Sequence, residues 1–403
     1  MKAREKGLLG ICALYWVWHS GTQWTATLLP FLQWSSSPPM TPLQVSYFQG
    51  LGSFANLLGA ALLGAILDTY GTKGGFLIAA ITTTLYYAAL SYCQSLPAFF
   101  LVQMLRIGYQ FDIVAEMYLA TTTPENERTA AMLRLGTPLA LAMLCGPWLA
   151  STLTMSTSLR TAQLLVGPAM LAVFLPLLLR LLPPSHNPPR KLMENRLRPL
   201  SYLRMLFTHP DLLLALGLRL TLVVAHIGYE LVSRQFLMRA LVREPADSRF
   251  MLGVMGGAVL FTQIVILPAL QGRCGPQAVL SLAYAVLAGA YVALPWVYTY
   301  NHLATILGVQ AAAYAIAYTE TSCQISSSVD KGEMGRALGL AGMVQWAAHC
   351  LTPLLVGHLV TLFHYSNVFL LGAAISGSTA LGILIGGAAL NQRAVALPSL
   401  FTH

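Results

Sequence analysis

The 403-residue chain contains very little charge, since Asp, Glu, Lys and Arg together make up only 9% of it. Soluble globular proteins carry about a quarter. This scarcity, together with 56% hydrophobic residues, excludes a soluble enzyme and an intrinsically disordered protein. A nucleic-acid-binding module is excluded as well, because most of the net charge of +9 lies between apolar runs too long for a globular core. The composition predicts a polytopic membrane protein embedded in the lipid bilayer.

Three long stretches, 7–67, 274–319 and 337–392, contain no Asp, Glu, Lys or Arg. A helix needs about 20 residues to cross a membrane, so each stretch holds at least two spans separated by a turn. Apolar segments along the whole chain predict twelve membrane-spanning helices. These begin near Leu8, Gln44, Gly74, Pro97, Thr129, Thr161, Asp211, Met251, Pro276, His302, Glu333 and Ser366. The runs lack the short alternating segments of a membrane β-barrel, so the predicted fold class is an all-α membrane protein.

One Pro-rich, basic segment divides the chain and predicts its domain organisation. We expect an N-terminal six-helix half at 1–182, a cytoplasmic linker at 183–210 and a C-terminal six-helix half at 211–403. Overlaid at a shift of 206 residues, the halves match at Glu127 with Glu333 and at Pro147 with Pro353. A parallel repeat of this kind predicts an alternating-access carrier whose site lies near the midplane between the halves.

The basic residues predict the orientation in the membrane. With the amino terminus in the cytoplasm, 15 of the 23 Lys and Arg residues face the cytoplasm, five face outside and three lie within spans. Because cytoplasmic loops carry the excess of basic residues, both termini are expected in the cytoplasm. The sequence leaves open whether the protein resides in the plasma membrane or in an organelle.

Several kinds of chemistry are missing from the sequence. It contains no phosphate-binding G-x-x-x-x-G-K-[ST] loop, no Cys/His spacing of a metal site and no G-x-S-x-G nucleophile motif. We therefore expect no cofactor, no metal and no enzymatic activity.

The segment after the second span reads G-A-I-L-D-T-Y-G-T-K, and it resembles the cytoplasmic loop signature of the major facilitator superfamily. The matching positions are Gly64, Asp68, Gly71 and Lys73; threonines replace two basic residues of the signature. The resemblance implies a conformational switch, in which Asp68 faces the positive amino end of span eleven. The alternative interpretation is an ordinary polar turn.

Spans four and five strengthen this resemblance, which extends over the whole chain. Arg106 with Gln110 resembles the superfamily's R-x-x-Q-G element, although the glutamine comes one residue late. Gly146 and Pro147 resemble the antiporter signature of span five, where they imply a helix bend. The pattern is most similar to the organic cation transporter-like and tetracycline antiporter branch.

Ionisable residues at membrane depth are unfavourable by a few kcal/mol and are therefore functional candidates. In span seven, Arg219, His226 and Glu230 fall on one helix face and predict a proton relay or a site for a charged substrate. Alternatively, Arg219 and Glu230 extend to the two membrane surfaces and leave His226 as a packed polar group.

Span four adds Asp112 and Glu116, four residues apart on one face, together with Arg106. Carboxylates this close predict a proton carrier; alternatively they pair structurally with Arg134 or Arg128.

Spans one and ten complete the set of candidates. His19 and Gln23 share a face of span one, while Gln310 lies on a polar face of span ten with Glu320 at its edge. The resemblance implies that spans one, four, seven and ten line a central cavity.

The function predicted from these features is secondary active transport of a small organic solute, in which buried acids bind protons and an organic cation or amphipathic compound in turn. Alternatives are a symporter or facilitator of a nutrient or organic anion, and a receptor without transport activity on the same scaffold. The expected partners are the small-molecule substrate, protons and the bilayer, and the expected functional unit is a monomer.

Overall fold

The computed structural model describes residues 3–123, 134–181, 205–233, 241, 245–329 and 334–396. Within the helices, the side chains of 60–71 and 116–117 are among those outside the described residues. The described part of the chain is almost entirely helical and contains no strand. The prediction of an all-α membrane protein is confirmed.

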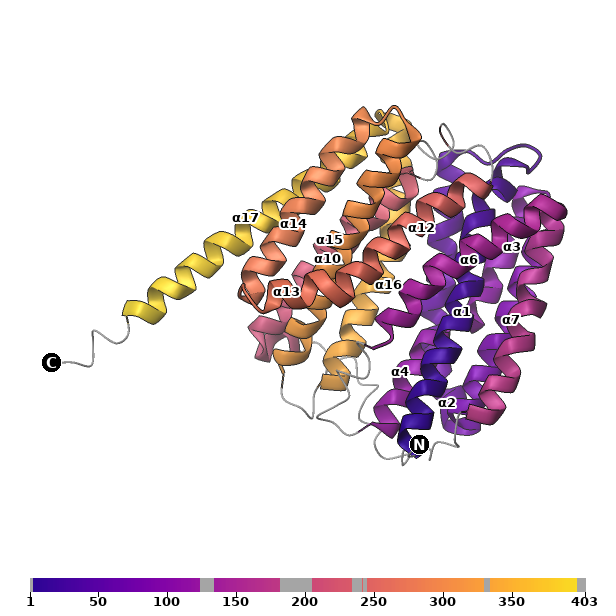
Figure 1. Ribbon diagram of the computed structural model, residues 1–403, viewed down its shortest axis with the longest axis horizontal. Helices are drawn as coiled ribbons and strands as arrows, with labels where there is room; N and C mark the ends of the chain where they lie inside the picture. The colour runs from indigo at the N-terminus through magenta and orange to yellow at the C-terminus, as the bar shows by residue number, and fades with distance from the viewer. Residues whose placement is uncertain are drawn as a thin grey trace.

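The first part of the chain, which runs from indigo to magenta in Figure 1, forms seven elements. They are α1 (Ala3–Trp34), α2 (Pro42–Tyr92), α3 (Leu96–Gln103), the 3-10 turn η1 (Met104–Gly108), α4 (Phe111–Thr122), α6 (Gly136–Ser156) and α7 (Leu159–Leu181).

The second part, from pink to yellow in Figure 1, forms nine. They are α10 (Pro210–Val232), α12 (Pro245–Phe261), the π-turn η3 (Thr262–Ile266), α13 (Leu267–Gln271), α14 (Pro276–Ala293), the 3-10 turn η4 (Leu294–Trp296), α15 (Tyr300–Ser327), α16 (Met334–Leu362) and α17 (Ser366–Ala396).

Local sequence signals explain several helix starts. Thr41 and Gln44 form a capping box at the start of α2, and Thr299 caps α15 by accepting a hydrogen bond from the His302 N–H. Pro210 and Pro276 stand at the first positions of α10 and α14, where a missing N–H is harmless. These starts agree with the expected ones to within a few residues.

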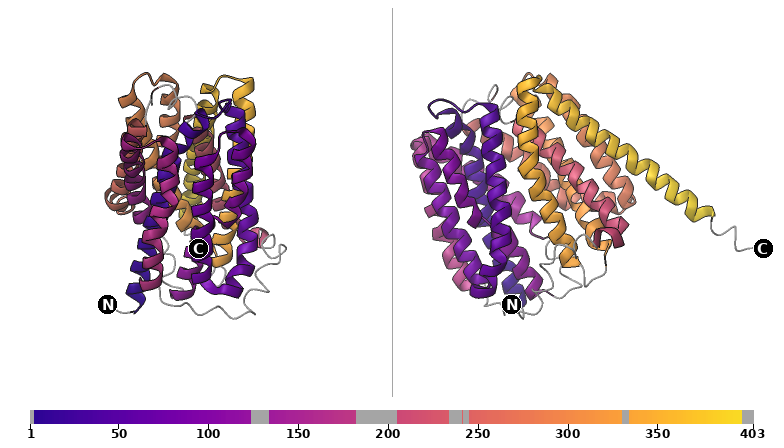
Figure 2. Two further views of the ribbon diagram at one scale, coloured as in Figure 1. Left: turned by 90° about the vertical axis from the view of Figure 1, so that its right-hand side faces the viewer. Right: turned by 180° about the vertical axis from the view of Figure 1, so that it is seen from behind.

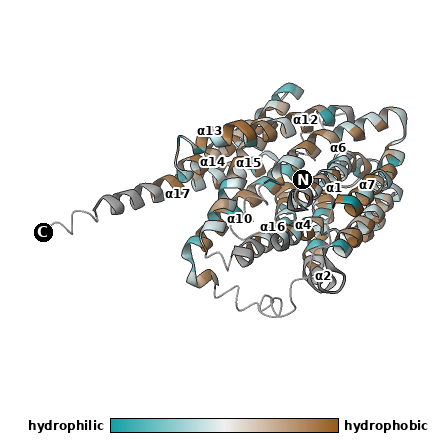
Figure 3. Cartoon of the chain, turned by 60° about the horizontal axis from the view of Figure 1, so that its bottom comes forward, coloured by the Kyte–Doolittle hydropathy of each residue, from teal (hydrophilic) through white to brown (hydrophobic). Residues whose placement is uncertain are grey.

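By length and composition, nine helical segments of the described residues can cross a membrane. They correspond to the predicted spans three to nine, eleven and twelve. The predicted spans one and ten lie in α1 and α15, which are 32 and 28 residues long but carry more polar side chains. Large apolar side chains such as Leu101 and Ile264 are exposed on the helices, as expected for contact with lipid, and Figure 3 shows the apolar stretches.

Helix α2 contains two spans rather than one. Gly59 lies against the carbonyl of Ile107, and the Thr82 hydroxyl donates to the carbonyl of Gly108 at 2.9 Å. A straight helix would separate positions 59 and 82 by about 35 Å. Ile107 and Gly108 are adjacent in the sequence, so they could not contact both positions of a straight helix. The chain therefore reverses direction between Gly59 and Thr82, where the sequence predicts the loop between spans two and three.

The predicted span four is not one continuous helix. It is interrupted between α3 and α4 by η1 and by Tyr109 and Gln110, which are outside any helix. The interruption lies against glycines of α2: a Cβ at Gly52 would come within 2.5 Å of Arg106 Nη1, and a Cβ at Gly59 within 1.9 Å of the Ile107 carbonyl. Only a residue without a side chain permits this approach.

Helices α1 to α7 lie together on one side of the molecule and α10 to α17 on the other (Figures 1 and 2). Contacts between the two sides join α2 with α16, as where the Tyr47 hydroxyl and His358 Nε2 are 3.1 Å apart, and α6 with α12, where Gly256 packs on Met143. The α2–α16 contact is at the end opposite the amino terminus, and the two helices diverge towards the amino-terminal end (Figure 2).

Candidate transport site

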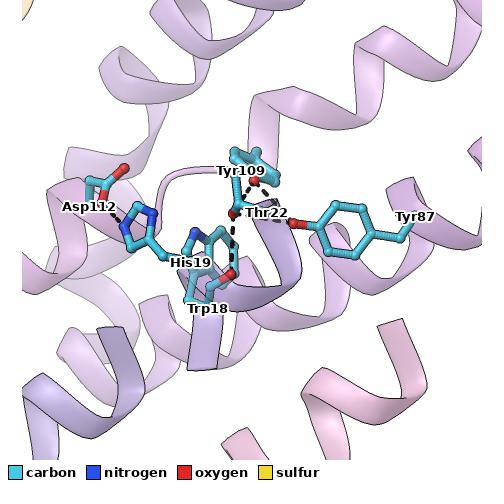
Figure 4. A network of polar contacts seen from close by, with 6 residues as sticks. All are labelled: Trp18, His19, Thr22, Tyr87, Tyr109 and Asp112. Carbon is cyan, nitrogen blue, oxygen red and sulfur yellow. Dashed lines mark hydrogen bonds and ion pairs between the residues drawn. The ribbon is translucent and has the colours of Figure 1, made fainter. Parts of the chain in front are cut away.

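An ion pair joins His19 on α1 to Asp112 on α4. His19 Nε2 and Asp112 Oδ1 are 2.9 Å apart, and the two side chains face each other across the helices in Figure 4. Both residues were predicted from the sequence as candidates, but on separate spans; the structure brings them together. Of the alternative partners predicted for Asp112, Arg134 is exposed, and Arg128 is outside the described residues, so a pair with Arg128 stays a prediction.

The two members of this pair differ in exposure. The Asp112 side chain is 45% exposed and the His19 side chain 12%, although Asp112 lies inside the span Leu96–Ala115. A carboxylate at this depth is stable only where it faces water or protein instead of hydrocarbon. We therefore expect the exposed face of Asp112 to meet water and not lipid.

Three hydroxyl groups fix the interruption of span four to the neighbouring helices. Thr22 Oγ1 lies 2.7 Å from the Tyr109 hydroxyl and 3.4 Å from that of Tyr87, while the two tyrosine hydroxyls are 3.1 Å apart (Figure 4). The Trp18 ring stacks on Phe111 at 4.7 Å. Since these groups come from α1, α2 and the residues beside Asp112, they set the position of the carboxylate.

None of the three hydroxyl residues was singled out from the sequence. Thr22 could have been found, because it lies on the same face of α1 as Trp18 and one turn from His19. Tyr87 and Tyr109 gave no signal, because tyrosines are common in this chain, which contains 17 of them.

Arg106 is engaged by protein groups at the interruption. The amide of Asn56, oriented to satisfy both groups, accepts from the Arg106 guanidinium and donates to the Arg106 carbonyl, both at 2.9 Å. The guanidinium also lies 5.6 Å from the centre of the Tyr109 ring. Gln110 donates to the backbone carbonyl of Asn56 at 2.8 Å. Arg106 and Gln110 therefore hold the interruption against α2.

Arg219 on α10 is 3% exposed and reaches neither membrane surface. Its guanidinium donates to the Tyr318 carbonyl at 2.9 Å and to the Ser322 hydroxyl, and it lies 3.6 Å over the Tyr318 ring. The alternative in which Arg219 extends to the surface is thus wrong. The arginine joins α10 to α15.

His226 on α10 meets α15 through two residues. Gln310 Nε2 lies 3.0 Å from His226 Nδ1, and the Tyr314 ring stacks on the imidazole at 3.9 Å with an angle of 24° between the planes. Gln310 is fully buried and also contacts the Tyr291 hydroxyl at 3.4 Å. The structure therefore joins the predicted candidates His226 and Gln310.

Two further titratable groups, Glu230 on α10 and His349 on α16, lie close to this cluster. His349 is within electrostatic influence of Glu230, His226 and Arg106, and Glu230 also acts on Tyr314. The Glu230 side chain is half-buried. His349 was missed from the sequence because span eleven offers no second charged residue near it.

The remaining predicted residues lie elsewhere. Glu320 is 2% exposed and accepts a hydrogen bond from Gln271 at 2.6 Å, away from the His226 cluster. Gly146 packs against α1, where a Cβ would come within 2.7 Å of Gln23 Cβ, so Gln23 and the Gly146–Pro147 pair belong to the α1–α6 contact.

Two predicted elements cannot be placed. The surroundings of Gly64, Asp68 and Gly71 from the switch motif lie outside what the structure describes, as does the side chain of Glu116. Lys73, the last residue of the motif, is half-buried in α2. Within the described ranges, no group of three or more His, Cys, Asp or Glu side chains is arranged to hold a metal ion.

These features define a helical membrane protein with polar, titratable groups held between its helices. The family model described as Major Facilitator Superfamily matches residues 11–233, more than half of the chain. The chain belongs to this superfamily, and it is a multi-pass membrane transporter, not an enzyme.

Solved structures with the same fold include a point mutant of the nucleoside transporter NupG, with a TM-score of 0.70 and 15% sequence identity over 94% of this chain and 99% of that one. They also include the human organic anion transporter MFSD10, also named TETRAN, with a TM-score of 0.66 and 17% identity over 95% of this chain and 100% of that one. At these identities the similarity shows the fold alone. No curated protein matches the sequence.

Proposed function

We propose that the protein is a proton-coupled antiporter that exchanges protons for an organic cation or an amphipathic compound. The observation that carries this proposal is the ion pair of His19 with Asp112, whose carboxylate is half-exposed inside a membrane span. A partly hydrated carboxylate binds either a proton or a cation, and the two compete for one site. Such competition is the minimum requirement for antiport.

The pair supplies both states that this exchange needs. In the proton-bound state, His19 carries the proton and its charge neutralises that of the ionised Asp112. An arriving cation takes the place of the imidazolium charge next to Asp112 and favours the release of the His19 proton. Proton binding in turn favours the release of the cation, because two positive charges close to one carboxylate repel each other.

Aromatic side chains around both candidate clusters suit an organic cation. The Tyr15 ring lies 4.2 Å from the His19 ring, and on the other side of the molecule Tyr314 and Tyr318 lie 5.9 Å apart on α15. Aromatic faces attract organic cations and also bind apolar groups. They therefore support a cationic or amphipathic substrate.

The arginines support an anionic substrate less well. Arg106 is engaged by Asn56 and Arg219 by Tyr318 and Ser322, so their charges are largely used within the protein. MFSD10 is described as an organic anion transporter and NupG as a nucleoside transporter. A symporter or facilitator of a nutrient or organic anion is therefore the alternative, and a receptor without flux is the third possibility.

We also propose how the two parts of the chain move during transport. Two six-helix halves, 1–182 and 211–403, joined by the linker 183–210, rock about a site between His19 and His226 in a monomer. With both termini in the cytoplasm, the α2–α16 contact closes the outer side. The conformation described here then opens towards the cytoplasm.

Purified protein in liposomes tests the proposal. A library of organic cations, nucleosides and organic anions is screened for binding by thermal shift, and uptake of each hit is measured under an imposed pH gradient. We expect uptake of a cation against its gradient when the interior is acidic. Asp112→Asn is expected to abolish proton-driven accumulation, because an amide cannot bind a proton in this range. Asp211→Asn, an exposed acid in the first turn of α10, is the matched control.

Each outcome separates the alternatives. Uptake that ignores the pH gradient contradicts proton coupling and leaves a facilitator. Accumulation driven by an acidic exterior shows symport. Binding without any flux shows a receptor.

A further inference from the structure

The contact of Gln310 with His226 determines where the imidazole carries its proton. An amide nitrogen only donates hydrogen bonds, and Gln310 Nε2 is 3.0 Å from His226 Nδ1 and 3.4 Å from the Tyr291 hydroxyl. Nδ1 must therefore be the acceptor. In this arrangement His226 is neutral and carries its single proton on Nε2.

The same buried amide leaves its oxygen without a partner. Gln310 Oε1 is buried and has no hydrogen-bond partner. If the amide rotates by half a turn, Oε1 takes the place of Nε2 and accepts hydrogen bonds from a protonated Nδ1 and from the Tyr291 hydroxyl. The amide nitrogen is then the group without a partner. Both orientations leave one buried polar group unpaired, so the protonation state of His226 decides between them.

His19 has the opposite type of partner in an equivalent position. His226 follows His19 by 207 residues, and Gln310 follows Gln103 by the same number. Gln103, which is also fully buried, donates to the Tyr86 hydroxyl at 3.4 Å, as Gln310 does to Tyr291. The two histidines and the two glutamines therefore occupy corresponding positions, but Asp112 meets His19 at Nε2, whereas Gln310 itself meets His226 at Nδ1. The carboxylate favours an imidazolium, whereas the amide nitrogen favours a neutral ring.

Other charged and titratable groups surround His226 on each packed helix. Those on α10 and α15 are Arg219, Tyr229, Glu230, Tyr314 and Tyr318, the one on α16 is His349, and the one on α14 is Tyr291. Helix α17 brings Val368 and Gly372 to α10, which carry no charge. Glu230 favours the imidazolium, while Arg219 and a protonated His349 oppose it.

We infer that Gln310 is a positioning residue that keeps His226 neutral in this conformation, and that reversal of its amide permits protonation of His226. His226 is then a second proton site, which fills only when the amide turns. The role of this site in transport rests on the proposed function, but the protonation behaviour itself does not.

Nitrogen NMR of the full-length protein labelled at histidine tests the inference without any transport measurement. Among the nine histidines, the His226 signal is identified as the one that His226→Gln removes. In the wild type at alkaline pH, we expect His226 Nδ1 to show the signature of an unprotonated nitrogen. Gln310→Glu is expected to raise the proton affinity of His226 about 10-fold or more, because it creates the kind of pair that His19 makes with Asp112.

Two further variants keep the test conclusive. Gln310→Met neither donates nor accepts, so we expect a mixture of both neutral tautomers. Gln324→Glu adds a carboxylate on the same helix, about four turns away, and is expected to leave the His226 titration unchanged. If Gln310→Glu fails to fold, the His226 tautomer measured in the wild type and in Gln310→Met still tests the inference.

A protonated Nδ1 in the neutral wild-type ring would overturn the inference, as would a His226 titration that neither Gln310 variant changes. If transport proves indifferent to pH while the NMR result is as expected, the proposed antiport is wrong and the inference about Gln310 stands. If transport is proton-coupled while Gln310→Glu leaves the His226 titration unchanged, the inference about Gln310 is wrong and the proposed antiport stands.

Discussion

Thr22 shows how one small polar residue can determine the position of a functional group two contacts away. Its hydroxyl contacts Tyr109 and Tyr87, and Tyr109 lies three residues before Asp112 in the interrupted span. The carboxylate is therefore held by a hydroxyl cluster that it does not itself join. The cluster and the ion pair form one unit around α1.

Replacement of Thr22 by Val keeps the shape of the side chain but leaves the Tyr109 and Tyr87 hydroxyls with one partner fewer. We expect the free energy of unfolding to fall by about 1–3 kcal/mol, measured as a lower melting temperature in detergent. Thr152→Val is the control, because this exposed hydroxyl bonds only to the carbonyl of Trp148 in its own helix. Equal melting temperatures for the two variants would contradict the role of the cluster.

At the residue scale, the sequence identified the types of group but not their partners. His19 and Asp112 were both candidates because titratable residues are rare within spans. Their contact was not predictable, because it depends on how α1 packs against α4. Likewise, the sequence singled out Arg106 but not its partner Asn56. The periodicity of one helix gives a face, whereas a partner requires the packing of two.

Among the individual helices, the interrupted span four has the largest effect on the site, because the interruption lies directly before Asp112. The segment 97–116 contains only one glycine, Gly108, and no internal proline, so nothing local predicted a break. Residues of another helix stabilise the break: Gly52 and Gly59 on α2 leave space for it, and the Thr82 hydroxyl donates a hydrogen bond to it. Capped helix starts such as Thr41 and Pro276 were predictable because their signals are local.

Gly59→Ala tests this dependence. The added Cβ would lie 1.9 Å from the Ile107 carbonyl, so the backbone of η1 must move, and we expect a destabilisation of about 1–3 kcal/mol or more. Gly253→Ala on α12 is the control, because no described atom lies within 4 Å of its added Cβ. There the better helix propensity of alanine should be neutral or stabilising by up to about 1 kcal/mol. Thermal unfolding of both proteins gives the comparison.

The molecule as a whole is joined at one end by close packing of α2 on α16. A Cβ at Gly357 would lie 2.5 Å from the Ser46 hydroxyl, and a Cβ at Gly50 would lie 3.1 Å from the Leu354 side chain. Contacts this tight are made or lost together, because packed interfaces do not deform gradually.

Gly357→Ala is therefore expected to shift the population away from the conformation in which α2 and α16 touch. Spin labels at Thr41 and Thr361, both exposed, report the distance between the ends of the two helices. We expect a short distance in the wild type and an added longer population in Gly357→Ala. Gly342→Ala, on the same helix and without a described neighbour within 4 Å, should give the wild-type distribution. An unchanged distribution in Gly357→Ala would contradict the proposed closure of the outer side by the α2–α16 contact.

Cys274 reports the orientation of the whole molecule, and Cys93 serves as an unreactive reference. Cys274 is exposed in the turn between α13 and α14, which is expected on the cytoplasmic side. Cys93, after α2, is buried, and this burial raises the pKa of its thiol to about 11. Because only the thiolate reacts, Cys93 stays unreactive towards maleimide at neutral pH.

An impermeant maleimide should label Cys274 in inside-out vesicles and leave it unlabelled in sealed right-side-out vesicles. Mass spectrometry of the digested protein separates the two cysteines. Labelling of Cys274 from the outside would reverse the orientation and place the α2–α16 contact on the cytoplasmic side.

The interrupted span also has a consequence for the biogenesis of the protein. Leu96–Ala115 has the lowest mean hydropathy of the nine spans and contains Arg106 and Asp112. Such a segment enters the bilayer poorly by itself. The carbonyls of Arg106 and Gly108 accept hydrogen bonds from Asn56 and Thr82 of α2, so α2 must already be beside them. Span four therefore depends on earlier-made helices for its insertion. Damage to the α2 glycines will reduce the amount of protein in the membrane before it alters any rate of transport.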